Sequence, residues 1–406
     1  MALVSKTFSQ IITFTRASTA TFFNSAGTLT SAAVDAPRFD YNPSTLAAQG
    51  LLIEESRTNS LTYSEDFGNA AWTKSGSTVS TDTTTAPTGT TVADSLIEDS
   101  STGQHRVFRN ATGTTNTNPY TLSVFAKANT RTRIYLGIAE GTSFVRQGNA
   151  IFDLSAGIVV SAGSGSGGAT GGSATITPVG NGWYRCTYTL TLGGTDTTVF
   201  SDLNLVSTGT TISYTGDGTS GLFIWGAQLE AGAFPTSYIP TTTTALTRAQ
   251  DRAVVNTLSP WYNSVAGTIY AEFAVTQPSS GANQFVARVS DNSYNNQIGD
   301  FVSTTGFAAI STASGGVFDG LASTAIAVSA NTVAKFAGAY SANDLAACKD
   351  GGTVATDATA TIPSGLTRFD LGSDHAGFNN VKAGYLRRIT YYPRRLSNAE
   401  LQAITA

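Results

Sequence analysis

The sequence predicts an all-β protein with two β-sandwich (jelly-roll) domains in tandem, behind an N-terminal segment and before a short C-terminal helix. Composition is the first reason. Of the 406 residues, only 12% are charged, about half the fraction of an average soluble domain. The polar character therefore comes from hydroxyls and amides, and Thr suits a pleated sheet better than a long helix. With 21 Phe, 15 Tyr and 4 Trp, the chain has enough apolar material for a packed core.

Alternation of apolar and polar residues with a period of two is the second reason. In the stretch WYRCTYTLTL, one face of the predicted strand carries Tyr184, Cys186, Tyr188, Leu190 and Leu192. The opposite face carries Trp183, Arg185 and three threonines. An antiparallel strand with one covered face has this pattern. It also predicts that Cys186 is a buried, inert thiol.

Two further strands show the same alternation, and shorter strands are predicted beside them. The shared faces are Phe223, Trp225, Ala227 and Leu229 in residues 222–230, and Ile269, Ala271, Phe273 and Val275 in residues 268–275. Shorter strands are predicted at 122–126, 134–138 and 333–340. Clusters of Gly, Ser, Thr and Asn between them, such as residues 161–173, indicate loops. Many short strands at close spacing are typical of sandwiches and jelly rolls.

One helix is predicted, at the end of the chain. Ser397 and Glu400 form a capping box, in which each side chain bonds the main chain of the other residue. Leu396 and Leu401 flank this start as a hydrophobic staple.

The distribution of strands divides the chain into three sections and a linker. Residues 1–58 show little alternation, residues 59–240 hold the first strand-rich unit, and residues 255–406 hold the second. Residues 241–254 form a Thr-rich linker, and Pro240 before them favours an extended conformation. We therefore expect two sandwiches in tandem, joined by this linker.

Charge and hydrophobicity exclude two classes of function. The formal net charge of −4 argues against a nucleic-acid binder, which needs a basic surface. No run of 18 apolar residues occurs, so membrane insertion is not expected, and the first 15 residues lack the apolar stretch of a signal peptide. Cys186 and Cys348 are too few for a disulfide scaffold. We expect assembly in a reducing cytosol.

Several sequence blocks resemble proteins of tailed bacteriophages. The blocks ITFTRASTATFFNSAGTL, APRFDY and GLLIEESRTNSLTYSEDFGNAAWTKSG resemble a recurrent opening of phage structural proteins and their prophage relatives. The blocks PYTLSVFAKA, GNGWYRCTYTLTL and FIWGAQLEAGAFPTSYIPT resemble a carbohydrate-binding-module-type jelly roll. The final block, FDLGSDHAGFNNVKAGYLRRITYYPRRLSNAELQAI, is similar to the end of concanavalin A-like (laminin-G-like) lectin domains.

The resemblance implies a non-enzymatic structural protein on the virion surface: a tail fibre, a spike or a capsid-decorating head fibre. It implies a homo-oligomer, usually a trimer, that is assembled in the host cytoplasm and binds host-surface glycans during adsorption. Residues 1–58 are then expected to attach to other virion proteins or to join subunits. Two alternatives stay open: a glycan-cleaving depolymerase with an accessory sugar-binding module, and a purely architectural capsid or tail decoration without a ligand.

Aromatic residues outside the predicted core are the candidate sugar contacts, because sugars bind to an aromatic face as well as to amides and hydroxyls. Trp183 lies on the Thr-rich face of its strand. Trp72 and Trp261 lie in loop-like or strand-edge stretches, with Tyr262 beside Trp261. His375, in GSDHAGF, is a further candidate for ligand contact. For each of them the alternative is ordinary packing or a surface turn.

No catalytic residue is predicted. Only His105 and His375 could serve a nucleophile as base, and no GxSxG elbow occurs. His105 is expected at an exposed loop or strand end. Glu54 and Glu55 are adjacent, so in an extended segment they point to opposite sides and make a poor pair for glycoside hydrolysis.

No cofactor is expected, although a structural Ca²⁺ ion stays an option. The glycines of residues 163–168 match GxGxxG, but more loop and then a strand follow them where a dinucleotide site needs a helix. Two isolated histidines and two isolated cysteines cannot form a local zinc site. Calcium ligands could come from Asp217, or from Asp370 and Asp374. A group of four arginines near the C-terminus favours a solvated surface or ion pairs: Arg387, Arg388, Arg394 and Arg395.

Overall fold

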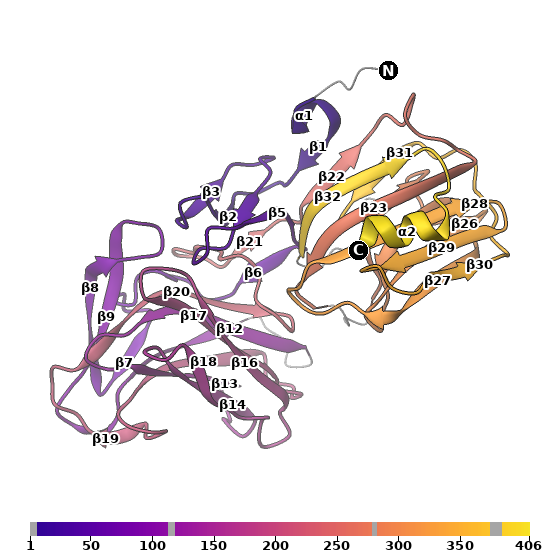
Figure 1. Cartoon of the computed structure of the whole chain (residues 1–406). Helices are drawn as coiled ribbons and strands as arrows, with labels where there is room; N and C mark the ends of the chain where they lie inside the picture. The colour runs from indigo at the N-terminus through magenta and orange to yellow at the C-terminus, as the bar shows by residue number, and fades with distance from the viewer. Residues whose placement is uncertain (1–5, 113–117, 278–281, 374–383) are drawn as a thin grey trace.

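The structure, a computed structural model, describes residues 6–112, 118–277, 282–373 and 384–406. Figure 1 shows two lobes built of strands, with the N-terminal segment passing between them. In the described residues, helices occur only near the two ends, as α1 (Phe8–Ile11) and α2 (Asn398–Thr405), and neither is long enough to cross a membrane. The predicted all-β class, with two sandwiches and a short C-terminal helix, is confirmed.

The first sandwich consists of two antiparallel six-stranded sheets, here named the front sheet and the back sheet. The front sheet has the order β15 (Ile158–Ala162), β14 (Gln147–Asp153), β13 (Arg133–Glu140), β18 (Thr198–Val206), β11 (Arg106–Thr112) and β7 (Thr73–Ser75). The back sheet has the order β16 (Thr170–Pro178), β17 (Trp183–Thr191), β12 (Pro119–Lys127), β20 (Gly221–Ala231), β9 (Thr91–Glu98) and β8 (Ser77–Thr85). A two-stranded ribbon adds β10 (Thr102–Gln104) and β19 (Ser213–Thr215).

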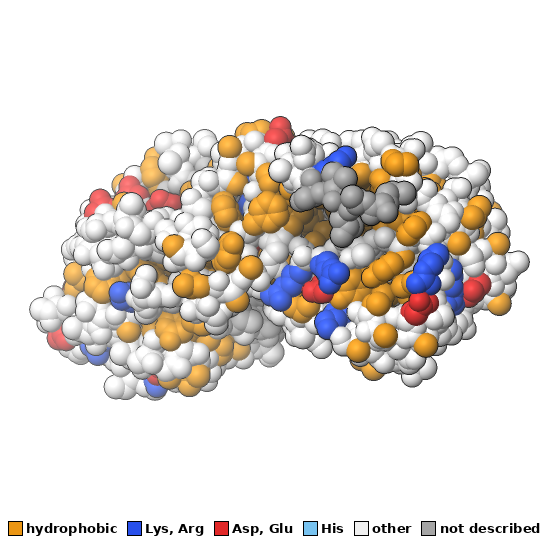
Figure 2. Space-filling model, turned by 45° about the horizontal axis from the view of Figure 1, so that its top comes forward, with side chains coloured by type: hydrophobic (Ala, Val, Ile, Leu, Met, Phe, Trp, Pro, Cys, Tyr) orange, Lys and Arg blue, Asp and Glu red, His pale blue; other side chains and the backbone are white. Residues whose placement is uncertain are grey.

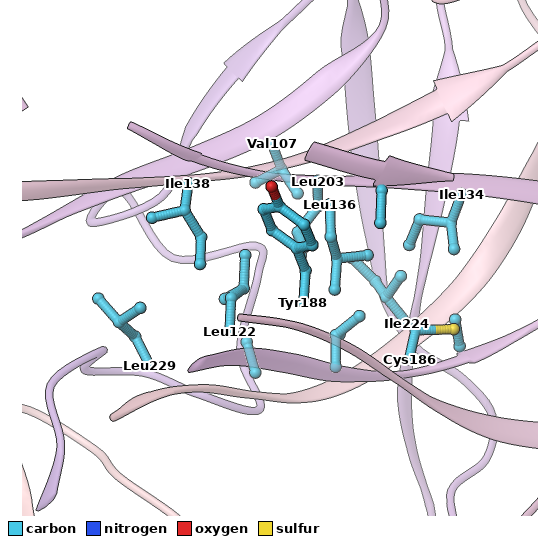
Figure 3. Close-up of a cluster of buried hydrophobic side chains, with 14 of the residues drawn as sticks. Val107, Leu122, Ile134, Leu136, Ile138, Cys186, Tyr188, Leu203, Ile224 and Leu229 are labelled. Atoms are coloured by element: carbon cyan, nitrogen blue, oxygen red, sulfur yellow. The ribbon is translucent and has the colours of Figure 1, made fainter. Parts of the chain in front are cut away.

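The core of the first sandwich lies between these two sheets. Figure 3 shows side chains of the front sheet, such as Leu136, facing side chains of the back sheet, such as Leu122 and Cys186. Tyr188 reaches across toward the front sheet, and its hydroxyl donates a hydrogen bond to the carbonyl of Gly163 (2.7 Å). The predicted inner face of residues 183–192 is confirmed. Cys186 is a free thiol without exposed surface, and burial raises its pKa, which keeps it inert.

In strand β20, the predicted shared face of Phe223, Trp225, Ala227 and Leu229 is wrong. Ala227 and Leu229 point into the core between the sheets, whereas Phe223 and Trp225 lie on the opposite side of the back sheet. The reason is a β-bulge in the pairing with β12, where Gly226 has a left-handed φ of 64°. A bulge inserts one residue and shifts the alternation, so one strand supplies both faces.

The second sandwich consists of two antiparallel seven-stranded sheets. One has the order β1 (Thr13–Thr15), β22 (Arg252–Val255), β31 (Arg368–Leu371), β24 (Gln284–Ser290), β25 (Gln297–Val302), β26 (Phe307–Ser314) and β27 (Val317–Ala327). The other has the order β30 (Ala355–Asp357), β29 (Asp344–Lys349), β28 (Ala334–Ser341), β23 (Ala266–Val275), β32 (Gly384–Tyr392), β5 (Ala48–Ile53) and β4 (Phe39–Tyr41). The predicted inner face of residues 268–275 is confirmed by the burial of its four members in the core.

Helix α2 covers the outer side of this second sheet. Ser397 accepts a hydrogen bond from the main chain of Glu400, and the Glu400 carboxylate accepts one from the main chain of Ser397. Leu396 and Leu401 are buried against strands β28 and β29. The predicted capping box and hydrophobic staple are therefore confirmed.

The N-terminal segment belongs to both lobes. Its strands β1 and β5 pair with β22 and β32 of the second sandwich, and the hairpin of β2 (Ala20–Phe23) and β3 (Leu29–Ala32) packs on the first. Strand β6 (Arg57–Asn59) pairs with β21 (Leu246–Arg248) of the linker. Strand pairing thus crosses the predicted boundary at residue 58, and the linker is part of the fold.

Five charged side chains without significant exposure hold this junction together. Asp251 accepts hydrogen bonds from Arg16 (3.1 Å) and Arg38 (2.5 Å), and Glu54 lies 2.8 Å from Arg38 and 3.5 Å from Arg248. Burial opposes ionisation of Glu54, but the facing guanidinium groups and hydrogen bonds from Ser237 outweigh it and lower its pKa to about 2. The cluster joins the N-terminal segment, the linker and the last segment of the first sandwich.

Candidate functional site

The outer face of the front sheet carries polar and aromatic residues that alternate with core residues. On β14, Asn149 and Ile151 flank the core residue Ala150, so both point outward. On β13, Tyr135 points outward in the same way and pairs directly with Ile151. Ser161 of β15 pairs with Ile151 from the other side. A row of outward side chains therefore crosses three neighbouring strands.

A groove of about 710 Å³ lies over this row. Ligand sites commonly have volumes of about 300–1,000 Å³. Its lining consists of Gln104, Tyr135, Gln147, Gly148, Asn149, Ile151, Ser161, Gly163, Ser164, Gly165, Ser166, Thr210 and Ile212. By contrast, an apolar cavity beside Ile53 and Leu386 in the second sandwich holds only about 30 Å³, which is room for a water molecule. The groove is the better candidate for a ligand.

Three side-chain amides in the groove are free to bind a ligand. Within the part of the chain that the structure describes, the side chains of Gln104, Gln147 and Asn149 make no hydrogen bond to another residue. The hydroxyl of Tyr135 is likewise unbonded there. Each amide offers two donors and one acceptor. The groove thus presents unused donors and acceptors on rigid strands and on the ribbon beside them.

A glycine-rich loop after β15 forms one wall of the groove. Ser166 and Gln147 exchange main-chain hydrogen bonds (2.8 and 3.4 Å), which hold the loop against β14. Gly165 and Gly167 have left-handed φ angles of 105° and 64°, which favour glycine. A Cβ atom at Gly167 would lie 2.0 Å from the carbonyl oxygen of Val145. The glycines therefore let the loop approach the sheet closely.

The ribbon of β10 and β19 forms the opposite wall and is held by buried polar contacts. Glu98 accepts hydrogen bonds from Arg131 (2.6 and 2.8 Å) and from the Tyr214 hydroxyl (2.7 Å). His105 has no exposed surface; its ring nitrogens face the carbonyl oxygens of Gly76 and Tyr214. The prediction that His105 is exposed is wrong, because it ties the ribbon to the sandwich.

The groove lining is neutral. None of the described residues that line it is Asp, Glu, Lys, Arg or His, and burial raises the pKa of Tyr135 further above its usual value. The lining therefore stays uncharged over the physiological pH range. Amides and hydroxyls suit the hydroxyl groups of a sugar, and the side chains of Tyr135, Ile151 and Ile212 suit its apolar C–H face. Glycoside hydrolysis needs two carboxylates about 5–10 Å apart, which the lining does not supply.

Comparisons with known proteins find no matching family model and no matching curated protein. Among solved structures, the carbohydrate-binding module CBM40 of a Ruminococcus gnavus IT-sialidase, bound to α2,3-sialyllactose, matches with a TM-score of 0.31 and 18% identity over 36% of this chain and 84% of that chain. Domains LG4-5 of the mouse laminin α1 chain match with a TM-score of 0.26 and 13% identity over 74% and 88%. Trypanosoma rangeli sialidase in complex with the inhibitor DANA matches with a TM-score of 0.31 and 12% identity over 77% and 60%. At these scores the likeness carries no argument about ligand or activity.

Two of the predicted sugar contacts are buried. Trp72 is 1% exposed, packs against Phe67 and donates its indole N–H to the Tyr63 carbonyl (2.9 Å). Trp183 is 2% exposed and donates to the Thr85 carbonyl (2.9 Å). Neither ring offers a free face to a sugar. For Trp183 the reason is the N-terminal segment, whose Leu29 helps to cover the outer side of the back sheet.

Trp261 and Tyr262 lie together in the second sandwich. Both are half-buried and pack against Tyr391, with ring centroids 5.1 and 5.8 Å from it. The indole N–H of Trp261 donates a hydrogen bond to the Thr257 carbonyl (2.8 Å). The two rings close one end of the core, and they stand apart from the groove, whose lining comes from the first sandwich.

The remaining predicted positions do not form a metal centre among the described residues. Asp217 accepts hydrogen bonds from Thr219 and Ser220 within its own turn. Asp370 is buried and bonded to Arg368. His375 and Asp374 lie outside the described residues.

The predicted arginine group is dispersed over the second sandwich and mostly paired. Arg394 bonds Glu400 (2.7 Å), Arg395 bonds Asp344 (2.8 Å), and Arg388 lies 3.9 Å from Glu272. Figure 2 shows Lys and Arg side chains next to acidic ones on this lobe. The ion pairs agree with the predicted surface role.

Sequence reasoning missed the groove residues Gln104, Tyr135, Gln147 and Asn149. A signal was present on β14, where Gln147, Asn149 and Ile151 alternate with small or apolar residues in QGNAIFD. This alternation predicts an outward polar face. It does not indicate which loops rise beside that face.

Proposed function

We propose that the chain binds neutral oligosaccharides in the groove of the front sheet and does not cleave them. The observation that carries this proposal is the set of three side-chain amides, Gln104, Gln147 and Asn149, which line one groove with Tyr135 and make no hydrogen bond within the described part of the chain. A site built to hydrogen-bond a ligand leaves its own donors and acceptors free. Binding without cleavage is supported by the lining, whose described residues include no pair of carboxylates.

We further propose that the protein is displayed on a virion surface as a homo-oligomer, usually a trimer, as the sequence resemblance implies. Weak single-site binding then becomes useful through avidity. Exposed apolar side chains support association. Strand β27 stands at a sheet edge, where unpaired strands invite partners, and exposes Val317, Phe318, Leu321 and Ile326.

The N-terminal segment remains the proposed contact with other virion proteins. Its strands are used inside the fold, so such a contact has to use outward side chains. Four large apolar side chains of this segment are 45–53% exposed: Ile11, Val34, Phe39 and Leu46. Labelling purified particles with an antibody against this chain, followed by electron microscopy, tests the location. Label on the heads or tails of the particles supports display on the virion, and particles without label contradict it.

A glycan array followed by calorimetry tests the binding proposal. The full chain is applied to an array of neutral and acidic oligosaccharides, and the strongest neutral hit is titrated into wild type and into Asn149→Ala. We expect the variant to lose at least tenfold in affinity. Asn110→Ala is the matched control, because Asn110 is an exposed amide on the same sheet outside the groove.

Three results would count against the proposal. If no oligosaccharide on the array binds, a purely architectural role is favoured. If Asn149→Ala and Asn110→Ala lose affinity for the oligosaccharide equally, the groove is not the binding site. Release of reducing sugar that disappears when a single carboxylate is replaced favours the depolymerase alternative.

A further inference from the structure

A buried polar cluster lies on the outer face of the front sheet, beside the groove. Asp202 and Asn204 of β18 flank the core residue Leu203, so alternation places them on the outer face. Polar side chains on an outer face normally meet water. Asp202 is nevertheless only 4% exposed, and Asn204 has no exposed surface.

Three polar atoms of this cluster have no hydrogen-bond partner in the described part of the chain. Asp202 Oδ2 accepts hydrogen bonds from Arg106 (3.2 Å) and from the Asn204 amide (2.7 Å). Among the residues that the structure describes, Asp202 Oδ1, Asn204 Oδ1 and Arg106 Nε are buried and make no hydrogen bond. Leaving buried polar atoms unpaired is costly. Three such atoms in one contacting group indicate that a partner belongs there.

Tyr135 separates this cluster from the groove. Gly137 is the direct cross-strand neighbour of Asp202, and a Cβ atom at Gly137 would lie 2.7 Å from Cε1 of Tyr135 and 2.9 Å from its hydroxyl. The Tyr135 ring therefore lies over Gly137, whose neighbour on the next strand is Asp202. After burial, the negative charge of Asp202 is the next cause that raises the pKa of Tyr135, so the carboxylate lies near the ring.

The Tyr135 ring is not anchored in this position. Its hydroxyl makes no hydrogen bond within the described part of the chain, whereas the buried hydroxyl of Tyr188 does. The ring also lines the groove, so it can turn into open space. Rotamer changes of accessible side chains are fast, on the order of nanoseconds.

We propose that Tyr135 is a movable cover over a second polar subsite, in which Asp202, Asn204 and Arg106 bind neighbouring hydroxyl groups of a neutral sugar residue. This inference rests on the proposed function, since the same oligosaccharide occupies the groove. Two hydroxyls donate to Asp202 Oδ1 and Asn204 Oδ1, and one accepts from Arg106 Nε. An acidic sugar would bring its carboxylate against Asp202, which selects for a neutral residue.

The subsite makes binding depend on pH. Burial raises the pKa of Asp202 to about 6, although Arg106 and Asn204 lower it. The groups that face it are Arg106 of β11, Tyr135 of β13 and Asn204 of β18. Hydroxyl donors bond the ionised carboxylate more strongly than the protonated one. If only that form binds, a pKa of about 6 gives a roughly tenfold loss of affinity between pH 7 and pH 5.

Calorimetry with the strongest neutral array hit tests the subsite. It is titrated into wild type and Asp202→Asn at pH 5, 6 and 7. We expect the variant to bind at least tenfold more weakly at pH 7 and to lose the pH dependence. Asp153→Asn is the matched control: it breaks an Arg–Asp pair on the same sheet face, with Arg133 at 2.9 Å, where the Asp153 carboxylate is fully bonded. Its affinity should equal that of wild type.

The outcomes separate the subsite from the groove. Loss of binding in Asn149→Ala, combined with unchanged affinity of Asp202→Asn and a flat wild-type pH profile, overturns the subsite and leaves the groove intact. If no neutral oligosaccharide on the array binds, both the groove proposal and the subsite proposal are overturned. If Asp202→Asn does not fold, the wild-type pH profile decides alone: a flat profile refutes the subsite, and the tenfold loss supports it.

Discussion

The buried charge cluster at the junction of the two lobes allows a quantitative prediction for Asp251→Asn. Asp251 has no exposed surface and accepts hydrogen bonds from Arg16, Arg38 and the main-chain N–H of Glu54. Replacing Asp251 by Asn leaves Glu54 as the one carboxylate of the cluster for three buried guanidinium groups, those of Arg16, Arg38 and Arg248. Removing one partner of a buried ion pair costs about 3–5 kcal/mol. We expect a loss of this size in the free energy of unfolding.

Urea unfolding followed by tryptophan fluorescence measures this loss, with Asp217→Asn as control. The Asp217 side chain is exposed and, among the described residues, bonds only within its own turn, so its replacement should cost far less than that of Asp251. The charge of both variants changes equally. If Asp251→Asn loses no more stability than Asp217→Asn, the cluster does not hold the N-terminal segment between the lobes, and the reasoning is refuted.

Three further predictions concern the second sandwich and the buried tryptophan. Asp300 is buried, and burial raises its pKa although a hydrogen bond from the main chain of Gly338 lowers it; the contribution of Asp300 to the free energy of unfolding is therefore greatest below about pH 4 and declines as pH rises. Asp300→Asn should gain stability relative to wild type between pH 4 and pH 7 in urea unfolding, and a constant difference contradicts this. Trp183→Ala should cost about 3–5 kcal/mol but leave glycan affinity unchanged by calorimetry, whereas lost affinity in the folded variant restores a sugar-contact role. Phe318→Lys with Leu321→Lys should reduce the oligomer mass in light scattering, and an unchanged mass excludes the edge of β27 as the interface.

Local sequence patterns predicted the parts of the fold that depend on neighbouring residues. The inner face of residues 183–192 followed from the period of two, and the start of α2 at Ser397 followed from its capping box. The bulge at Gly226 was not predictable, since alternation assumes an unbroken strand. Pairing of β5 with β32 joins residues more than 300 positions apart, and alternation carries no information on such partners.

The candidate site was harder to predict because it depends on which outer faces stay uncovered. Trp183 occupies the polar face of its strand, as predicted, but the N-terminal segment covers that face. Asn149 occupies an outward position of the same type, and there the glycine-rich loop and the ribbon leave a groove open. Both side chains face away from the core, so only the long-range fold distinguishes them.

A crystal structure of the full chain with the strongest neutral oligosaccharide of the array is the decisive test of sugar binding in the groove. We expect sugar density in the groove of the front sheet, within hydrogen-bond distance of Gln104, Gln147 and Asn149, with the Tyr135 ring turned away from Gly137. Density beside Trp261 and Tyr262 in the second sandwich, with the groove filled by water alone, would contradict it.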